Sequence, residues 1–172
     1  MYKRILVPLD GSDLAEAVLP YAQSLAQCLG SEIVLLRVTV NPVVEFSFAD
    51  PAIAASTIRE IEREAKNYIE SKCSELEAAG MRVSFLIREG PVADTILAVA
   101  EAMQVEIIAM STHGRSGIRR WLLGSVTERV VHHSSIPVMV IRPQQSSQSS
   151  DNQSDHAIGN RDELLLAEKE KD

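Results

Sequence analysis

The sequence has few of the features that would indicate a metal site, a redox centre or a membrane span. Its two cysteines, Cys28 and Cys73, lie far apart within apolar helical patterns, so they fit small core residues better than a metal-binding or redox pair. No apolar run approaches the ~18 residues that cross a bilayer, and only three apolar residues stand between Arg4 and Pro8. We therefore expect a cytoplasmic protein with free thiols.

Concentrated positive charge is also lacking. The net charge is −7, of which the seven acidic and three basic side chains of residues 144–172 contribute −4, leaving −3 for residues 1–143. Attraction to nucleic acid or to an anionic membrane requires a basic face, which this balance does not provide. We expect neither nucleic acid nor a membrane as a partner.

Strand-like apolar runs alternate with helical segments along residues 1–143, which is typical of stacked βαβ units. This order predicts an α/β fold with a mainly parallel sheet and helices on both faces. The predicted strands are Lys3–Leu9, Glu32–Val40, Met81–Arg88, Val105–Met110 and Ile136–Arg142. The predicted helices run from Ser12 or Asp13 to Gly30, from about Ala54 to Gly80, from Pro91 to Met103 and from about Val126 to His133.

The first helix is predicted to be continuous. Ser12 or Asp13 can cap its start, and Gly30 can end it. Its apolar stripe follows helical spacing and consists of Leu14, Val18, Tyr21, Leu25 and Leu29.

The composition changes after Pro143. No apolar residue occurs from Gln144 to His156, so this stretch buries too little surface to order itself. We expect one domain over residues 1–143 and a polar, acidic, disordered tail over residues 144–172.

The segment between the fourth strand and the last helix has the features of a phosphate site. Gly114 and Gly124 are separated by nine residues, and Gly124 and Ser125 stand directly before a helix. Glycine allows close approach of the backbone to a ligand, and the first amides of a helix point outward without internal partners. This segment would lie beside Asp10–Ser12, because open α/β sheets bind ligands where the strand order reverses.

Structural interpretations of these residues remain open. Ser125 and Glu128 fit a capping box, so Ser125 can cap the helix, bind phosphate or do both. Asp10 can cap the following helix. Four arginines make the segment basic, which suits phosphate but is also common on solvated surfaces: Arg115, Arg119, Arg120 and Arg129.

Several motifs together resemble the universal stress protein family. They are Val7–Ser12, Gly90–Pro91, His113–Gly114 followed by Gly124–Ser125, and Pro137–Val140. The resemblance runs over about Met1 to Pro143. It implies a five-stranded parallel sheet of order 3-2-1-4-5, in a Rossmann-like three-layer sandwich of the adenine nucleotide alpha hydrolase-like type. It also implies a homodimer formed through the last strand, Pro137 to Arg142.

Some members of that family bind ATP through the pattern Gly, two residues, Gly, nine residues, Gly, then Ser or Thr. Gly114, Gly124 and Ser125 match this pattern, whereas Ser111 occupies the first glycine position and adds a Cβ and a hydroxyl.

The resemblance also implies a binding role for individual residues. Pro8, Leu9 and Asp10 would border adenine and ribose, with the Val38 backbone reading adenine. Asp10 would be the nearest carboxylate to a Mg²⁺ ion. The residues that would surround the phosphates are Met110, Ser111, His113, Gly114, Gly124, Ser125, Val126 and Thr127.

Three functional hypotheses follow. The leading one is a stress-responsive regulatory protein that binds ATP, with Mg²⁺, because no convincing catalytic set is present. The second is a slow ATPase or nucleotidyl-transfer enzyme in which His113 or Asp10 orients water, although a P-loop of the form Gly-x-x-x-x-Gly-Lys-Ser/Thr is absent from the sequence. The third is a dimeric interaction module without nucleotide, in which Ser111 marks the lost site.

Overall fold

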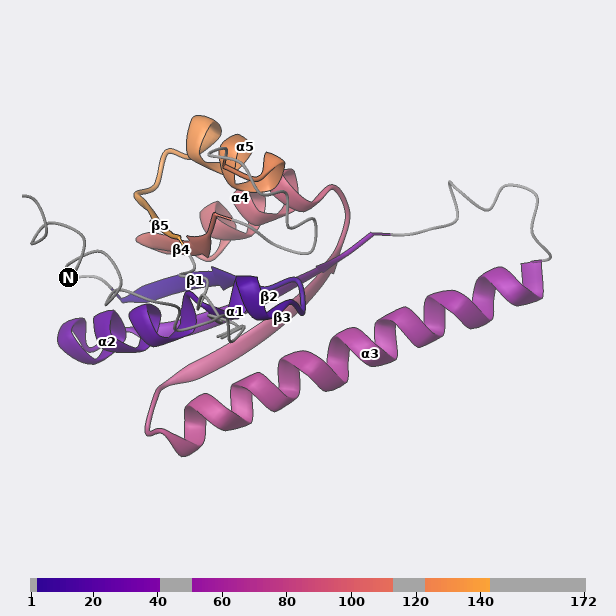
Figure 1. Cartoon of the computed structure of the whole chain (residues 1–172), viewed down its shortest axis with the longest axis horizontal. Coiled ribbons are helices and arrows are strands. Elements are labelled where there is room, and N and C mark those ends of the chain that lie inside the picture. The colour runs from indigo at the N-terminus through magenta and orange to yellow at the C-terminus, as the bar shows by residue number, and fades with distance from the viewer. Residues whose placement is uncertain (1–2, 41–50, 113–122, 143–172) are drawn as a thin grey trace, which may run out of the picture.

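The computed structural model describes residues 3–40, 51–112 and 123–142, and it has a five-stranded sheet with helices on both sides (Figure 1). The strand order is β3-β2-β1-β4-β5, and each pair of neighbours is parallel. The predicted fold class and strand order are therefore confirmed. The strands are β1 (Arg4–Pro8), β2 (Glu32–Thr39), β3 (Val83–Glu89), β4 (Ile107–Ser111) and β5 (Val138–Ile141).

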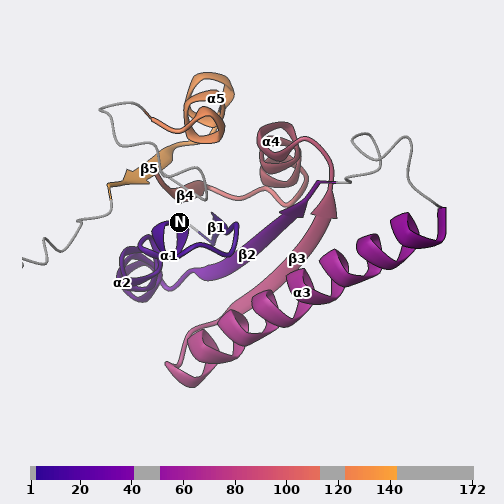
Figure 2. The same ribbon diagram turned by 45° about the vertical axis from the view of Figure 1, so that its right-hand side comes forward.

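The helices divide between the two faces of the sheet. In Figure 2, α3 (Pro51–Ala78) lies along β2 and β3, on the same side as α1 (Asp13–Glu16) and α2 (Leu19–Leu29). The other face carries α4 (Val92–Ala102) and α5 (Ser125–His133). The chain thus changes face between the first three helices and the last two.

The prediction of one continuous first helix is wrong, because this segment forms two helices, α1 and α2. Pro20 lies in the first turn of α2, and a proline has no N–H to donate to the carbonyl four residues earlier, here that of Glu16. Of the predicted stripe, Val18 is buried and Leu25 packs against the core cluster, whereas Tyr21 is 51% exposed. The other buried residues of the two helices, which the stripe omitted, are Ala15, Ala22 and Ala26.

The predicted ends of this segment are confirmed. Ser12 caps α1, since its side chain accepts a hydrogen bond from the Ala15 amide at 3.2 Å. Gly30 ends α2 at φ 66°, ψ 35°, a left-handed conformation that glycine adopts with little strain.

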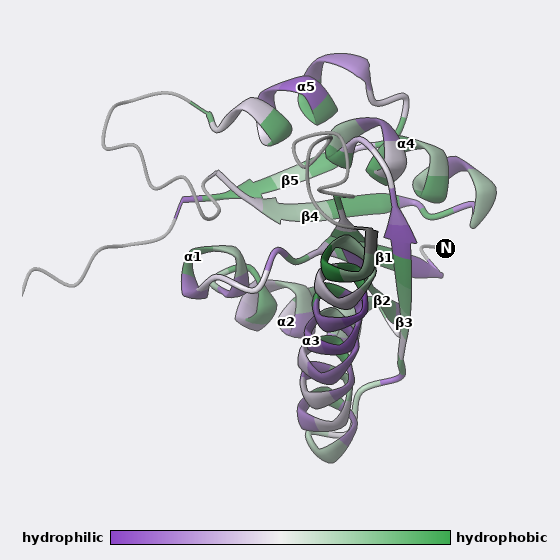
Figure 3. Cartoon of the chain, turned by 90° about the vertical axis from the view of Figure 1, so that its right-hand side faces the viewer, coloured by the Kyte–Doolittle hydropathy of each residue, from purple (hydrophilic) through white to green (hydrophobic). Residues whose placement is uncertain are grey.

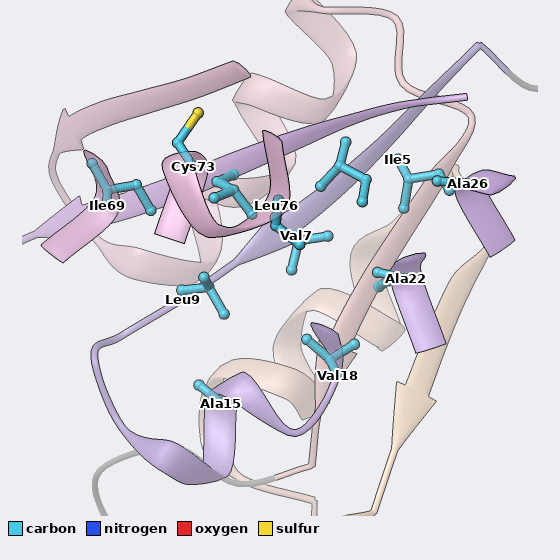
Figure 4. Close-up of a cluster of buried hydrophobic side chains, with 13 residues drawn as sticks. Ile5, Val7, Leu9, Ala15, Val18, Ala22, Ala26, Ile69, Cys73 and Leu76 are labelled. Carbon is cyan, nitrogen blue, oxygen red and sulfur yellow. The ribbon is translucent and has the colours of Figure 1, made fainter. Parts of the chain in front are cut away.

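Two apolar clusters hold the layers together, one on each face of the sheet. Figure 3 shows β4 and β5 as mainly hydrophobic ribbons, as expected for a parallel sheet covered on both sides. Figure 4 shows the cluster beneath α1, α2 and α3, where Ile5, Val7 and Leu9 of the β1 segment meet Ile69, Cys73 and Leu76 of α3. Cys73 is therefore a core residue, whereas Cys28 is exposed.

The last strand lies at an edge of the sheet. Pro137 directly precedes β5, a position that suits a residue without an amide donor. Within the described residues, no helix has both the length and the apolar character that a membrane span requires.

Burial in the sheet predicts a large difference between two isoleucines. Ile33 is 0% exposed, whereas Ile53 is 62% exposed. Ile33→Ala is expected to lower the free energy of unfolding by about 2–5 kcal/mol, because it leaves a cavity, and Ile53→Ala by about 0.5 kcal/mol or less. Urea titration followed by circular dichroism measures both, and equal losses would contradict the described core.

Candidate functional site

The β1–β4 boundary is the point where the chain changes from one face of the sheet to the other. The ladder between these strands pairs Ile5 with Ile107 and Leu6 with Ile108, although β1 continues to Pro8 and β4 to Ser111. Beyond these pairs, β1 stays with β2 and β4 stays with β5. The carboxyl ends of the two halves of the sheet therefore diverge at the topological switch point, where open α/β sheets bind ligands.

On the β1 side, the backbone of Val38 faces this point. The Leu9 amide donates to the Leu36 carbonyl at 2.9 Å, so Leu36 directs its backbone polar groups toward β1. Because these directions alternate along a strand, Val38 directs its N–H and C=O to the same side. It lies two residues beyond Leu36, the last β2 residue paired with β1.

The segment after β1 is fixed by a short turn. Asp10 Oδ1 accepts hydrogen bonds from the Ser12 amide at 3.0 Å and from the Ser12 hydroxyl at 2.6 Å. Ser12 in turn caps α1. Asp10 thus acts on the helix through Ser12, and its carboxylate remains half-buried beside the ends of the strands.

On the β4 side, a hydrogen bond joins the strand to the start of α5. The Gly124 amide donates to the Thr112 carbonyl at 2.8 Å, and the Thr112 amide donates to Ile141 at 2.8 Å. These two amides are thus used within the protein. The bond places Gly124 and Ser125 directly beside the carboxyl end of β4.

A buried side chain makes a second link at this junction. Thr127 Oγ1 donates to the Ser111 carbonyl at 2.9 Å. Ser111, Thr112 and Thr127 are three of the four buried polar residues among those that the structure describes, the fourth being Ser31. Burying polar groups is costly unless they are hydrogen-bonded, so this concentration shows that the β4–α5 junction is held by polar contacts.

The first turn of α5 presents outward amides. Its first intrahelical bond runs from the Glu128 amide to the Gly124 carbonyl at 2.9 Å, so the amides of Ser125, Val126 and Thr127 precede the helical ladder. They lie at the positive end of the helix dipole. This arrangement can bind an anion such as phosphate.

The capping box predicted for Ser125 and Glu128 is wrong. The N-cap is Gly124, and no side chain caps the helix there. Ser125 is the first residue of the helix, and its side chain is exposed. Gly124 has φ −58° and ψ 149°, an extended conformation open to any residue. The lack of a side chain, rather than an unusual dihedral, is therefore what glycine provides at this position.

The predicted site residues that the structure describes lie at the carboxyl ends of β1, β2 and β4 and at the start of α5. The set comprises Pro8, Leu9, Asp10, Val38, Met110, Ser111, Gly124, Ser125, Val126 and Thr127. His113 and Gly114 lie outside the described residues, as do Arg115, Arg119 and Arg120. Arg129 pairs with Asp94 of α4 at 2.9 Å, so this arginine joins two helices.

Sequence patterns missed two residues of this region. Thr112 closes the β4–α5 connection through its carbonyl, and no side-chain pattern could have marked a backbone contact. Arg37 donates from its guanidinium Nη1 to the Leu9 carbonyl at 3.2 Å. Its signal was a lone charge within the apolar run of the second strand.

The described side chains hold no cluster of three or more His, Cys, Asp or Glu suited to a metal ion. Asp10 is an acidic side chain that follows the end of β1 by two residues. A divalent ion here would need most of its oxygen ligands from a bound phosphate group and water, as is common for Mg²⁺.

Comparison with known proteins gives one consistent family. The model of the universal stress protein family matches residues 1–142. The universal stress protein MJ0577 of Methanocaldococcus jannaschii is 34% identical over 159 residues, covering 85% of this chain and 98% of that protein. Its solved structure matches with a TM-score of 0.76 over 85% of this chain and 99% of that one.

Two further solved structures share the fold. Universal stress protein UspA from Lactobacillus plantarum is 25% identical, with a TM-score of 0.70 over 82% of this chain and 98% of that one. A universal stress protein family protein from Arabidopsis thaliana, solved with AMP bound, is 17% identical. It has a TM-score of 0.63 over 87% of this chain and 97% of that chain, a likeness that shows the fold alone.

The Thr127–Ser111 bond predicts a stability difference between two threonines. Thr127→Val keeps the shape but leaves the buried Ser111 carbonyl without this donor, so the free energy of unfolding should fall by about 1–3 kcal/mol. The control is Thr57→Val, because the Thr57 hydroxyl donates to Ile53 at an exposed position and its loss should cost about 0.5 kcal/mol or less. Urea titration compares them; equal effects would show that the buried bond does not hold the junction.

Proposed function

The chain belongs to the universal stress protein family, and we propose that it binds ATP, with Mg²⁺, in a regulatory role in the cellular stress response. The observation that carries this proposal is the position of the three leading amides of α5, from Ser125 to Thr127, beside the diverging ends of β1 and β4. In this proposal they bind the phosphates, since amides at a helix N-terminus bind anions.

The other side of the switch point supports an adenine nucleotide in particular. The Val38 backbone supplies one donor and one acceptor toward β1, a pair that complements the acceptor and donor on the edge of adenine. Pro8, Leu9 and Asp10 would border the base and ribose. The Arabidopsis thaliana relative was solved with AMP bound, which supports the view that this fold accommodates an adenylate.

The proposed function includes a Mg²⁺ ion bound together with ATP. Asp10 is half-buried and adjoins the end of β1, so its carboxylate can provide one ligand to Mg²⁺ or orient a bound water. The ion would neutralise charge on the triphosphate. We propose that the protein senses nucleotide in the cytoplasm and acts as a binding protein.

Ser111 provides the observation behind a second candidate function, a dimeric interaction module without nucleotide. Its backbone carbonyl is held by Thr127, and strand alternation places its side chain on the face of Ala109, which packs with α1 and α2. If this serine has closed the site, Ser111→Gly should bind ATP where the native chain does not. Equal affinities would reject that alternative.

The lack of a side chain at Gly124 predicts a direct effect on binding. Gly124→Ala is compatible with the observed dihedrals, so the fold should persist while the added methyl obstructs the phosphates. The dissociation constant for Mg-ATP should rise at least about tenfold, a loss of ~1.4 kcal/mol or more. Isothermal titration calorimetry at high micromolar concentrations measures it.

The control for Gly124→Ala is Ser24→Ala, which removes an exposed hydroxyl on α2 that donates to the Pro20 carbonyl. Its affinity should equal that of the native chain. The unfolding temperature of each variant should rise when excess Mg-ATP is added, to a degree set by its affinity. Absence of binding by well-folded native protein would reject the proposed function outright.

We also propose that the protein forms a homodimer through β5. Among the strands that the structure describes, β5 pairs only with β4, and its four apolar residues are all half-buried in the single chain. Such an edge presents unpaired backbone groups and apolar side chains to a second chain. A second copy is the partner that the resemblance implies.

The direction of the backbone groups predicts which substitution separates the dimer. The Pro137 carbonyl accepts from Ile108 of β4 and the Ile141 carbonyl from Thr112, directly after β4, so alternation directs the Val140 amide to the free edge. Val140→Pro removes this outward donor and spares the β4 ladder, so light scattering should give the mass of one chain. An unchanged dimer mass would show that β5 pairing does not form the interface.

A further inference from the structure

Arg37 is an unusual residue for its position in the sheet. It follows four consecutive buried residues of β2, from Ile33 to Leu36. Strand alternation places its side chain on the face of Ile33 and Leu35, which is covered by α1, α2 and α3. A guanidinium at such a site is unfavourable unless its N–H groups find acceptors.

The Arg37 guanidinium holds Leu9, the residue that follows the end of β1. Arg37 Nη1 donates to the Leu9 carbonyl at 3.2 Å, and the Leu9 amide donates to the Leu36 carbonyl at 2.9 Å. Both backbone polar groups of Leu9 are therefore bonded to β2. Asp10 follows Leu9 directly, so its position depends on these two contacts.

Tyr68 of α3 supports the guanidinium from the other side. The Arg37 Cζ lies 6.0 Å from the centroid of the Tyr68 ring, at the outer limit of a cation–π contact. The Tyr68 hydroxyl donates to Glu16 Oε1 at 2.9 Å. Lys72, one turn further along α3, pairs with Glu16 Oε2 at 3.0 Å.

Both α3 groups keep their protons at neutral pH. Burial raises the pKa of Tyr68 above its ordinary value, and its hydrogen bond to Glu16 raises this pKa further. The hydrogen bond to Glu75 raises the pKa of Lys72, while partial burial opposes this and the bond to Glu16 adds to it. Glu16 thus receives two stable donors from α3.

These contacts form a closed ring around the segment that leads from β1 into α1. Asp10 holds Ser12, Ser12 caps α1, and α1 ends at Glu16. Glu16 is bonded to Tyr68, and Tyr68 lies against Arg37, which holds Leu9. The ring fixes the segment at both ends.

This step rests on the proposed function, in which Leu9 and Asp10 border adenine and ribose. We propose that Arg37 is a positioning residue for the base and ribose side of the nucleotide site, and that Tyr68 holds its guanidinium in place. The phosphate side is built from β4 and α5, through the Thr112–Gly124 and Ser111–Thr127 bonds. The phosphate side contains no residue of the ring. The two sides of the proposed nucleotide site are therefore held by separate sets of contacts.

This separation gives a test that ordinary destabilisation would not reproduce. Arg37→Met keeps the apolar stem and removes the guanidinium, so the dissociation constant for Mg-ATP should rise about tenfold. The affinity for magnesium tripolyphosphate, which has no base or ribose, should stay within about twofold. Tyr68→Phe keeps the ring and removes only the hydroxyl, and it should weaken ATP binding about threefold with the same tripolyphosphate affinity.

The matched control is Arg63→Met, because Arg63 is an exposed arginine of α3 paired with Glu60, and it should leave both affinities unchanged. Arg37→Lys retains a positive charge but not the planar fork, and it should recover part of the ATP affinity. Calorimetry on the full chain gives all these values, with unfolding temperatures as the check on folding.

The possible results separate the inference from the function on which it rests. Native protein that binds no ATP rejects the proposed function and with it this role of Arg37. If the native protein and Arg37→Met bind ATP with equal affinity, the inference alone is rejected. The inference is also rejected if Arg37→Met loses affinity for ATP and for tripolyphosphate to the same degree. If Arg37→Met fails to fold, the same comparison is made with Tyr68→Phe.

Discussion

The hydrogen bond from the Gly124 amide to the Thr112 carbonyl, 2.8 Å long, determines where α5 begins. It brings the two ends of the β4–α5 connection together, and the buried Thr127 hydroxyl adds a second bond to Ser111 at 2.9 Å. Because Gly124 and Thr112 use their amides in this way, the amides available for a ligand shift to Ser125, Val126 and Thr127. The site thus depends on a helix placed by polar contacts at the end of a buried strand.

The second constraint is the change of face between β1 and β4. The chain leaves β1 toward α1 and leaves β4 toward α5, on opposite sides of the sheet. The two halves of the sheet therefore diverge beyond Leu6 and Ile108. In the proposed function, the base side is held by β2, through Leu36 and Arg37, and the phosphate side is built from β4 and α5, so one nucleotide would span two separately supported halves.

The fold and the neighbourhood of the site could be predicted from the sequence, because apolar periodicity and the glycine pattern are local signals. Contacts that depend on tertiary structure could not. Ser125 and Glu128 match the sequence pattern of a capping box with Ser125 as N-cap. The N-cap is instead Gly124, one residue earlier, because Gly124 is bonded to Thr112. The apolar stripe continues across the break before Pro20, so periodicity alone does not reveal it. Arg37 belongs to no motif, because its acceptor is a backbone carbonyl 28 positions earlier.

Binding at the start of α5 is tested most directly by titrating the ¹⁵N-labelled full chain with Mg-ATP and following the amide chemical shifts. We expect the largest changes at two separate places, the amides of Ser125 to Thr127 and those of Leu9, Asp10 and Val38. Tripolyphosphate should reproduce only the first set. Saturable ATP binding that leaves the Ser125–Thr127 amides unshifted would contradict the claim that the start of α5 receives the phosphates.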